Sequence, residues 1–365
     1  MRCELSLQNN AYDEVDMPCY NQRGQSFISG VSMLFRILTG LSVVCALSSN
    51  GIAQQSACKA SDVPVGVISV SGNVFRGLAA QDFIGRVQKK PVAVKGLTFD
   101  DGPRRVLIVA DLSKKLSADS RKAEDEMIKT LLANARPQDT FAIMPARGPG
   151  QDVKFTDDRS AISQALGQPG DGKRGKEPGV LDTVMTGIEW FGAPQPGDAI
   201  VVMAPDLEGN HKANAKMVAK ALHDNHIRMF GLALGPVETK NSVASHFITS
   251  TTSQGLAETQ PLVGSILYDT GDEHFFPLTT NSGGLVLSVM NADPRRTYSM
   301  ADVHLADSVR QKARSVSNMI AAYYRMQVEP PAIAKPTDWD LTITDDIQKH
   351  SAPMFVLYPH EMGPC

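Results

Sequence analysis

Unbroken apolar runs through the middle of the chain predict buried strands. The run over 106–110 is Val-Leu-Ile-Val-Ala and ends at Asp111, as expected of a strand that is buried on both faces of a parallel sheet. Mostly apolar stretches that also predict strands cover 140–144, 199–203 and 227–234. Ligands of such sheets bind at the carboxyl ends of the strands, so Asp111 marks the edge where a site is expected.

Stretches with helical periodicity separate these runs. Residues 117–136 carry apolar side chains at every fourth position, and Pro137 ends the pattern. Helices are also expected over 181–191, 213–225 and 305–323. Strands that alternate with helices of this size predict an α/β fold with a doubly wound, mostly parallel sheet.

Both ends of the chain carry short patterns typical of β-strands. Two lie near the start, over 63–70 and 91–94, and three lie near the end, over 324–328, 339–343 and 355–358. We expect these end segments to pair with one another and to form a small β satellite beside the α/β core.

The first part of the chain resembles a targeting segment. Arg36 precedes the short apolar run 37–47, and small residues follow up to Ala53. This order describes a secretory signal peptide, and the run is too short for a membrane span. We therefore expect a true start at Met33 and export to the periplasm or the cell exterior.

These patterns divide the chain into five parts. They are a mis-assigned start or disordered stretch over 1–32, a signal peptide over 33–53, an N-terminal β segment over 58–104, the α/β domain over 105–323, and a C-terminal β segment over 324–365 that pairs with 58–104.

Cleavage after Ala53 would leave two of the five cysteines, Cys58 and Cys365, near the ends of the mature chain. Because exported compartments are oxidising, this even pair predicts a Cys58–Cys365 disulfide. Two free thiols remain the alternative, since the sequence does not show that the ends meet.

Composition adds little beyond the class of a soluble globular protein. The 365 residues are 42% hydrophobic and 21% charged, with a formal net charge of -3. These values give no reason to expect nucleic acid or an anionic membrane surface as a partner.

Short motifs follow one another in a fixed order along most of the chain. Residues 77–83, 111–113, 136–139, 155–159, 181–182, 200–203, 282–284 and 324–326 make up the set. As an ordered set they resemble the VWFA-related family of secreted bacterial proteins, which has the von Willebrand factor A fold. The resemblance assigns 105–323 to the von Willebrand A-like domain.

The resemblance also implies a metal-ion-dependent adhesion site at the carboxyl edge of the sheet. The family pattern is Asp-x-Ser-x-Ser with a Thr and an Asp on two further loops. Asp111 and Ser113 match it, but Lys115 replaces the second Ser and Pro178 lies where the Thr is expected. Asp206 matches only if the alignment slips by one residue.

We therefore expect a degenerate site. The ammonium of Lys115 either repels a dication or itself neutralises Asp111. Mg²⁺ needs nearly complete oxygen coordination, so no cofactor is expected, and Asp111, Ser113 and Asp206 are the ligands if a metal binds at all. The predicted binding residues are Asp111, Ser113, Lys115 and Asp206.

The function expected from this set is that of an exported, non-enzymatic binding module for a protein or cell-envelope component. The segment 236–283 interrupts the strand–helix alternation and is expected to add to the same surface. One alternative is a metal-dependent polysaccharide deacetylase, because 98–103 matches the first motif of such enzymes, although no His occurs before His211. A structural envelope protein without a ligand is the other alternative.

Overall fold

The computed structural model describes residues 60–69, 72–113, 116–148, 150–165, 178–207, 209–234, 275–289, 300–351 and 354–363. All of these residues belong to one compact unit, Gln55–Cys365. The expected signal peptide, Cys58, Cys365, Lys115 and most of the 236–283 segment lie outside the described residues. No helix within them is long and apolar enough to cross a membrane.

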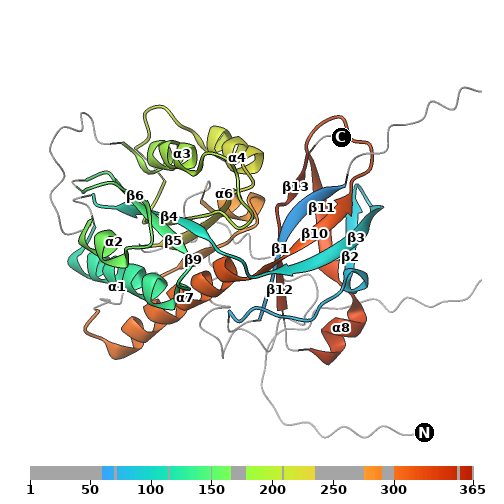
Figure 1. Cartoon of the computed structure of the whole chain (residues 1–365), viewed down its shortest axis with the longest axis horizontal. Helices are drawn as coiled ribbons and strands as arrows, with labels where there is room; N and C mark the ends of the chain where they lie inside the picture. Colours follow the sequence, from blue (N-terminus) through green and yellow to red (C-terminus); the bar gives the residue numbers. More distant parts are fainter. Residues whose placement is uncertain are drawn as a thin grey trace, which may run out of the picture. The chain divides into compact units, whose positions relative to one another are not determined.

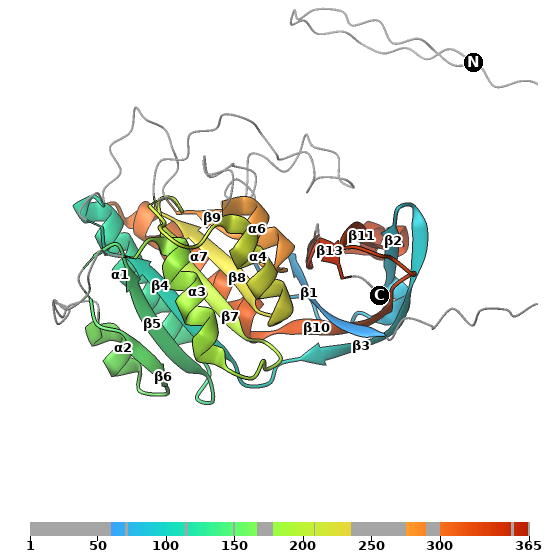
Figure 2. The same cartoon turned by 90° about the horizontal axis from the view of Figure 1, so that it is seen from above.

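Six described strands form a mostly parallel sheet in the order β6-β5-β4-β7-β8-β9. Figure 1 labels β4, β5, β6 and β9 of this sheet, and Figure 2 labels β7 and β8 as well. All neighbouring pairs are parallel except β5 and β6. In chain order this is the 3-2-1-4-5-6 arrangement of doubly wound sheets. The prediction of an α/β fold with a mostly parallel sheet is confirmed. The strands are β4 (Arg105–Asp111), β5 (Thr140–Ala146), β6 (Val153–Thr156), β7 (Ala199–Ala204), β8 (Arg228–Ala233) and β9 (Val286–Ser288).

Helices cover both faces of this sheet (Figure 2). Because side chains alternate along a strand, Ile108 of β4 packs with one helical layer and Leu107 with the other. The first layer holds α1 (Ala118–Asn134), α2 (Arg159–Ala165) and α7 (Val303–Ala321), and the second holds α3 (Val180–Phe191), α4 (Ala215–Asp224) and α6 (Phe275–Asn281). β4 is therefore buried from both sides, which explains its unbroken apolar sequence.

The start of α1 follows from its N-cap. Ser117 is extended, and its Oγ accepts a hydrogen bond from the backbone N–H of Ser120 at 3.0 Å. Such a cap satisfies one of the backbone donors that the first turn leaves free. The helix predicted over 117–136 is confirmed to within two residues at its end.

A second, seven-stranded sheet has the order β12-β1-β10-β3-β2-β11-β13. All its strand pairs are antiparallel. Its strands are β1 (Ser61–Ser69), β2 (Phe83–Val87), β3 (Lys90–Asp100), β10 (Tyr323–Glu329), β11 (Thr337–Ile343), β12 (Met354–Leu357) and β13 (Glu361–Met362). A 3-10 turn, η1 (Ala80–Asp82), precedes β2, and the short helix α8 (Asp345–His350) follows β11.

Strands from the two ends of the chain alternate within this sheet. β10 lies between β1 and β3, and β1 in turn lies between β10 and β12. The sheet has its own apolar core, in which Tyr324, Met326 and Trp339 are buried.

Two short crossings connect the two sheets. β3 ends at Asp100 and β4 begins at Arg105, while α7 ends at Ala321 and β10 begins at Tyr323. Arg104 lies at the point where both crossings meet. Its Nε donates to the carbonyl of Ile320 at 3.0 Å, and its Nη2 donates to the carbonyl of Ala321 at 3.2 Å.

Candidate functional site

Asp111 lies at the carboxyl end of the central strand β4 and is only 1% exposed. The chain turns back on this carboxylate immediately after the strand. The backbone N–H of Ser113 donates to Oδ1 at 3.0 Å, and its hydroxyl donates to Oδ2 at 3.2 Å. The Asp-x-Ser motif therefore forms a closed local turn at the edge of the sheet.

Arg147 occupies the space between Asp111 and Asp206. It directly follows β5, the neighbour of β4. Its Nε and Nη2 donate to the two oxygens of Asp111 at 3.1 and 2.6 Å. Its Nη1 donates to the carboxylate of Asp206, and Nη2 also donates to the Asp206 carbonyl at 3.2 Å. One guanidinium thus joins two loops, and we call Asp111, Ser113, Arg147 and Asp206 the rim.

The charges of the rim compensate one another. Burial lowers the pKa of Arg147, but the hydrogen bond to Asp206 and the charge of Asp111 outweigh it and hold the pKa above its usual value. Bidentate pairing of guanidinium with carboxylate is among the stronger polar contacts in proteins. Arg147 is therefore a permanent cation at this edge of the sheet.

The backbone of Arg147 is held in an unusual conformation. Its φ is 51°, in the left-handed region that non-glycine residues seldom adopt. Its N–H donates to the carbonyl of Pro178 at 3.0 Å. Pro178, which lies where the family pattern expects a Thr, contributes a main-chain oxygen to the position of Arg147.

A second buried carboxyl group lies near Asp111. Glu124 of α1 is 3% exposed, and its Oε1 has no hydrogen-bond partner among the described residues. Burial and the negative charge of Asp111 raise the pKa of Glu124 well above its usual value. Arg121 opposes this rise by its positive charge and donates to the carbonyl of Ser113 at 2.7 Å. The site therefore brings buried carboxyl groups together with the guanidinium groups of Arg147 and Arg121.

Asp182 fixes the loop that follows β7. Its carboxylate accepts backbone hydrogen bonds from His211, Lys212 and Ala213 at 2.8, 2.9 and 2.7 Å. Partial burial raises the pKa of Asp182, but these bonds outweigh it and the pKa lies below its ordinary value. The loop is thus tied to the start of α3.

The structure brings three of the four predicted rim residues to one place. Asp111, Ser113 and Asp206 lie at the same edge, whereas Lys115 falls outside the described residues. Arg147 is not among the residues predicted from the sequence. The sequence feature that could have identified Arg147 is its position, because it directly follows the strand that is expected beside β4.

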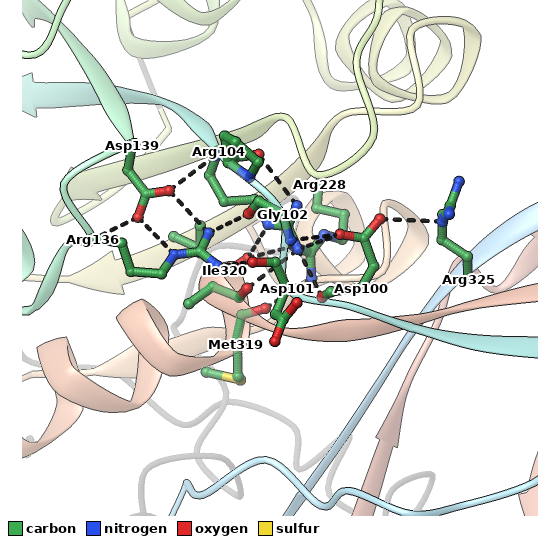
Figure 3. Close-up of polar contacts among 12 residues, drawn as sticks. Asp100, Asp101, Gly102, Arg104, Arg136, Asp139, Arg228, Met319, Ile320 and Arg325 are labelled. Carbon is green, nitrogen blue, oxygen red and sulfur yellow. Dashed lines mark hydrogen bonds and ion pairs between the residues drawn. The ribbon is translucent and has the colours of Figure 1, made fainter.

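The motif behind the deacetylase alternative lies at a crossing between the two sheets (Figure 3). Asp100 accepts from Arg104 at 2.9 Å and from the N–H of Gly102 at 3.0 Å, and it lies 3.1 Å from Arg325. Asp101 is exposed and lies 3.8 Å from Arg76. Among the described residues, no group of three or more His, Cys, Asp or Glu side chains could hold a metal ion.

The described geometry defines the class of the α/β part. The central strand ends in Asp-x-Ser, the strand order is doubly wound, and β6 is an antiparallel edge strand. This is the von Willebrand factor A-like fold that the sequence motifs predict. No protein-family model and no curated protein matches the sequence.

Several solved structures are similar to the chain at low identity. An aerotolerance-related membrane protein from Bacteroides fragilis is 15% identical over 59% of this chain and 98% of its own, with a TM-score of 0.38. A von Willebrand factor type A protein from Catenulispora acidiphila is 11% identical over 85% and 74%, with a TM-score of 0.37. Proximal thread matrix protein 1 from the mussel byssus is 10% identical over 64% and 50%, also with a TM-score of 0.37. The fold assignment rests on the strand order and not on these similarities.

Proposed function

We propose that the chain is an exported, non-enzymatic binding module whose rim contacts a protein or cell-envelope partner without a metal ion. The observation that carries this proposal is the guanidinium of Arg147, which contacts the carboxylates of both Asp111 and Asp206. By the resemblance, Asp111 is a ligand position for a divalent cation, and Asp206 is one if the alignment slips by one residue.

The donor set does not fit a divalent cation. Mg²⁺ and Ca²⁺ need several oxygen ligands with free lone pairs. Here both oxygens of Asp111 accept hydrogen bonds from Arg147, and Oδ2 also accepts one from Ser113. The fixed positive charge of Arg147 repels a second cation at the same place.

A guanidinium at the rim also changes what the surface can recognise. It presents directional N–H donors and cannot leave, whereas a metal ion can exchange its ligands. We expect a partner to add hydrogen bonds around Arg147 and Asp206, the rim residue with the most exposed carboxylate.

The two ends of the chain agree with an exported binding module, because one carries a signal-peptide pattern and both contribute strands beside the α/β part. Export rests on the signal-peptide pattern over 33–53, and the Cys58–Cys365 disulfide would then join the two ends of the mature protein. In the proposed molecule the seven-stranded sheet is the β satellite that the end segments form beside the α/β part.

The test combines metal titration with partner capture by the mature protein. We expect no binding of Mg²⁺ or Mn²⁺ in the micromolar range by calorimetry. Capture of a partner from envelope extract is expected to be insensitive to EDTA. The variant Arg147→Gln should lower that capture at least tenfold, because it removes the ion pairs that hold the two loops together.

Lys129→Gln is the matched control, since it removes an exposed cation of α1 that pairs with Asp125 of the same helix. It should leave capture unchanged. Micromolar metal binding by the unaltered protein would overturn the proposal, and so would capture that EDTA abolishes or that Arg147→Gln leaves intact.

A further inference from the structure

A pocket of about 460 Å³ lies between the two sheets, at the edge of the parallel sheet opposite the rim. Its walls come from the loop before β7, from the start of β8, and from β1 and β10. Because the strands are parallel, their amino ends lie at this edge and their carboxyl ends at the rim. Its volume is within the usual range for small-molecule sites.

Three guanidinium groups lie at or beside this pocket, and two of them share one carboxylate. Asp100 pairs with Arg104 at 2.9 Å and with Arg325 at 3.1 Å. Figure 3 shows the Asp100 carboxylate facing Arg325 on one side and the Arg104 group on the other. Arg228 has no ion pair with a carboxylate among the described residues. Its Nη1 and Nη2 donate instead to the carbonyls of Met319 and Ile320.

Arg228 is the least compensated of the three. It is 2% exposed, and its Nε has no hydrogen-bond partner within the described part of the chain. Burial lowers the pKa of Arg228 to about 10, which still leaves it charged at neutral pH. Asp100 acts on Arg228 without a direct ion pair. A buried charge without a paired carboxylate is costly, so an anion in the adjacent pocket would stabilise it.

The pocket offers further contacts to such an anion. Arg325 lines it, and the Nε of Arg325 lies near Asp100 without the geometry of a hydrogen bond. Tyr323 also lines it, with its ring 4.2 Å from the guanidinium carbon of Arg228. Asp62 is a pocket residue of opposite charge, but it lies on the exposed part of β1. Positive charge exceeds negative charge even when Asp62 is counted.

The remaining wall is apolar and suits a hydrocarbon or aromatic body. Val63, Pro194 and Pro196 line it. Proline side chains are rigid, so this wall loses little conformational entropy when a ligand packs against it.

We propose that this pocket binds a small organic anion, with its carboxylate, sulfonate or phosphate group against Arg228 and Arg325 and its apolar body against Val63, Pro194 and Pro196. The site is distinct from the rim and does not depend on the function proposed for the rim.

The test uses the full chain with two fluorescent probes of similar shape and different charge. These are anionic 8-anilinonaphthalene-1-sulfonate and neutral N-phenyl-1-naphthylamine. The anionic probe is expected to bind at a single site, octanoate should displace it, and octanol should not. Arg325→Gln should weaken binding of the anion about tenfold, because it removes one charge-assisted contact, and it should leave the neutral probe unaffected.

Arg86→Gln is the matched control, because Arg86 is an exposed arginine on β2 of the same sheet. It should not change either affinity. Arg228→Met tests the role of the buried guanidinium. If Arg228→Met does not fold, Arg325→Gln still tests the proposal, since the Arg325 side chain is 41% exposed. Equal affinity for the two probes, no binding of the anion, or an anion affinity unchanged by Arg325→Gln would overturn the proposal.

Discussion

At the scale of single residues, Lys312 shows how burial sets a pH dependence. This lysine of α7 is 4% exposed, and its Nζ donates to the carbonyl of Ser288 at 2.7 Å. Burial lowers the pKa of Lys312 to about 8, whereas an unfolded lysine has a pKa of about 10.4. Between these values the unfolded chain binds more protons than the folded one, so the free energy of unfolding rises with pH.

The variant Lys312→Met should remove this contribution. We expect its free energy of unfolding at pH 7 to exceed that of the unaltered protein by about 1–2 kcal/mol, since methionine fits a similar volume without a charge. The difference should shrink as the pH rises from 8 to about 10.4. Urea denaturation at pH 7 and pH 9.5 measures both quantities.

Lys216→Met, at an exposed position on α4, serves as the control and should not change the pH slope. If the free energy of unfolding of Lys312→Met depended on pH as that of the unaltered protein does, Lys312 would not be the source of the pH dependence.

The rim shows what the sequence can specify about a site. Asp111 and Ser113 could be placed because they directly follow a strongly apolar strand, and strand ends meet at one edge of a parallel sheet. Arg147 could not be assigned to them, since it is 36 residues from Asp111 and 59 from Asp206 in the sequence. The residue that neutralises a carboxylate depends on which loops meet in space, and local patterns do not encode that.

At the scale of elements, the contact between β8 and β9 depends on a glycine. A Cβ on Gly284 would lie 1.9 Å from the carbonyl oxygen of Met229, closer than any real contact. The backbone N–H of Gly284 donates to the carbonyl of Thr279 at 2.9 Å, which fixes the segment before β9. Any side chain at this position would displace the edge strand from β8.

Gly284→Ala should therefore lower the free energy of unfolding by about 1–3 kcal/mol, the usual range for overpacking. Gly363→Ala is the matched control, because its nearest contact would be an ordinary 3.4 Å to His223. It should change stability by less than about 0.5 kcal/mol. Urea denaturation of the two variants measures both changes in the free energy of unfolding. Equal changes would mean that the backbone at Gly284 can shift to accommodate a Cβ, which contradicts the prediction.

Long elements follow from the sequence better than short ones. The period of α1 extends over four turns and begins at a serine cap, so its bounds could be predicted closely. β6 has only four residues, Val-Lys-Phe-Thr, and this is too few to distinguish a strand from the approach to α2. Its antiparallel pairing with β5 depends on the loop between them.

At the scale of the whole molecule, Arg104 connects the two sheets. Its side chain contacts Asp100 at the end of β3 and the last carbonyls of α7, while its backbone N–H donates to Asp139 at 2.9 Å. A buried group with so many partners should make the two sheets unfold together.

The two tryptophans test this coupling, because Trp190 lies in α3 and Trp339 in β11. Each single variant keeps one tryptophan as a fluorescent reporter. Trp190→Phe keeps Trp339, which follows unfolding of the seven-stranded sheet, and Trp339→Phe keeps Trp190, which follows unfolding of the α/β part. We expect their urea transitions to coincide in the otherwise unaltered protein. With Arg104→Met added, the two transitions should separate, because the common anchor of the crossings is lost. Separate transitions before Arg104 is changed would refute the coupling.

The place of β1 in the seven-stranded sheet has a consequence for biosynthesis. Both of its partners, β10 and β12, are translated more than 250 residues later. A chain cut short during translation would leave Val65, Val67 and Ile68 on an open strand edge, where proteases and chaperones recognise incomplete proteins. The edges of β1 are therefore covered only after β10 and β12 have been synthesised.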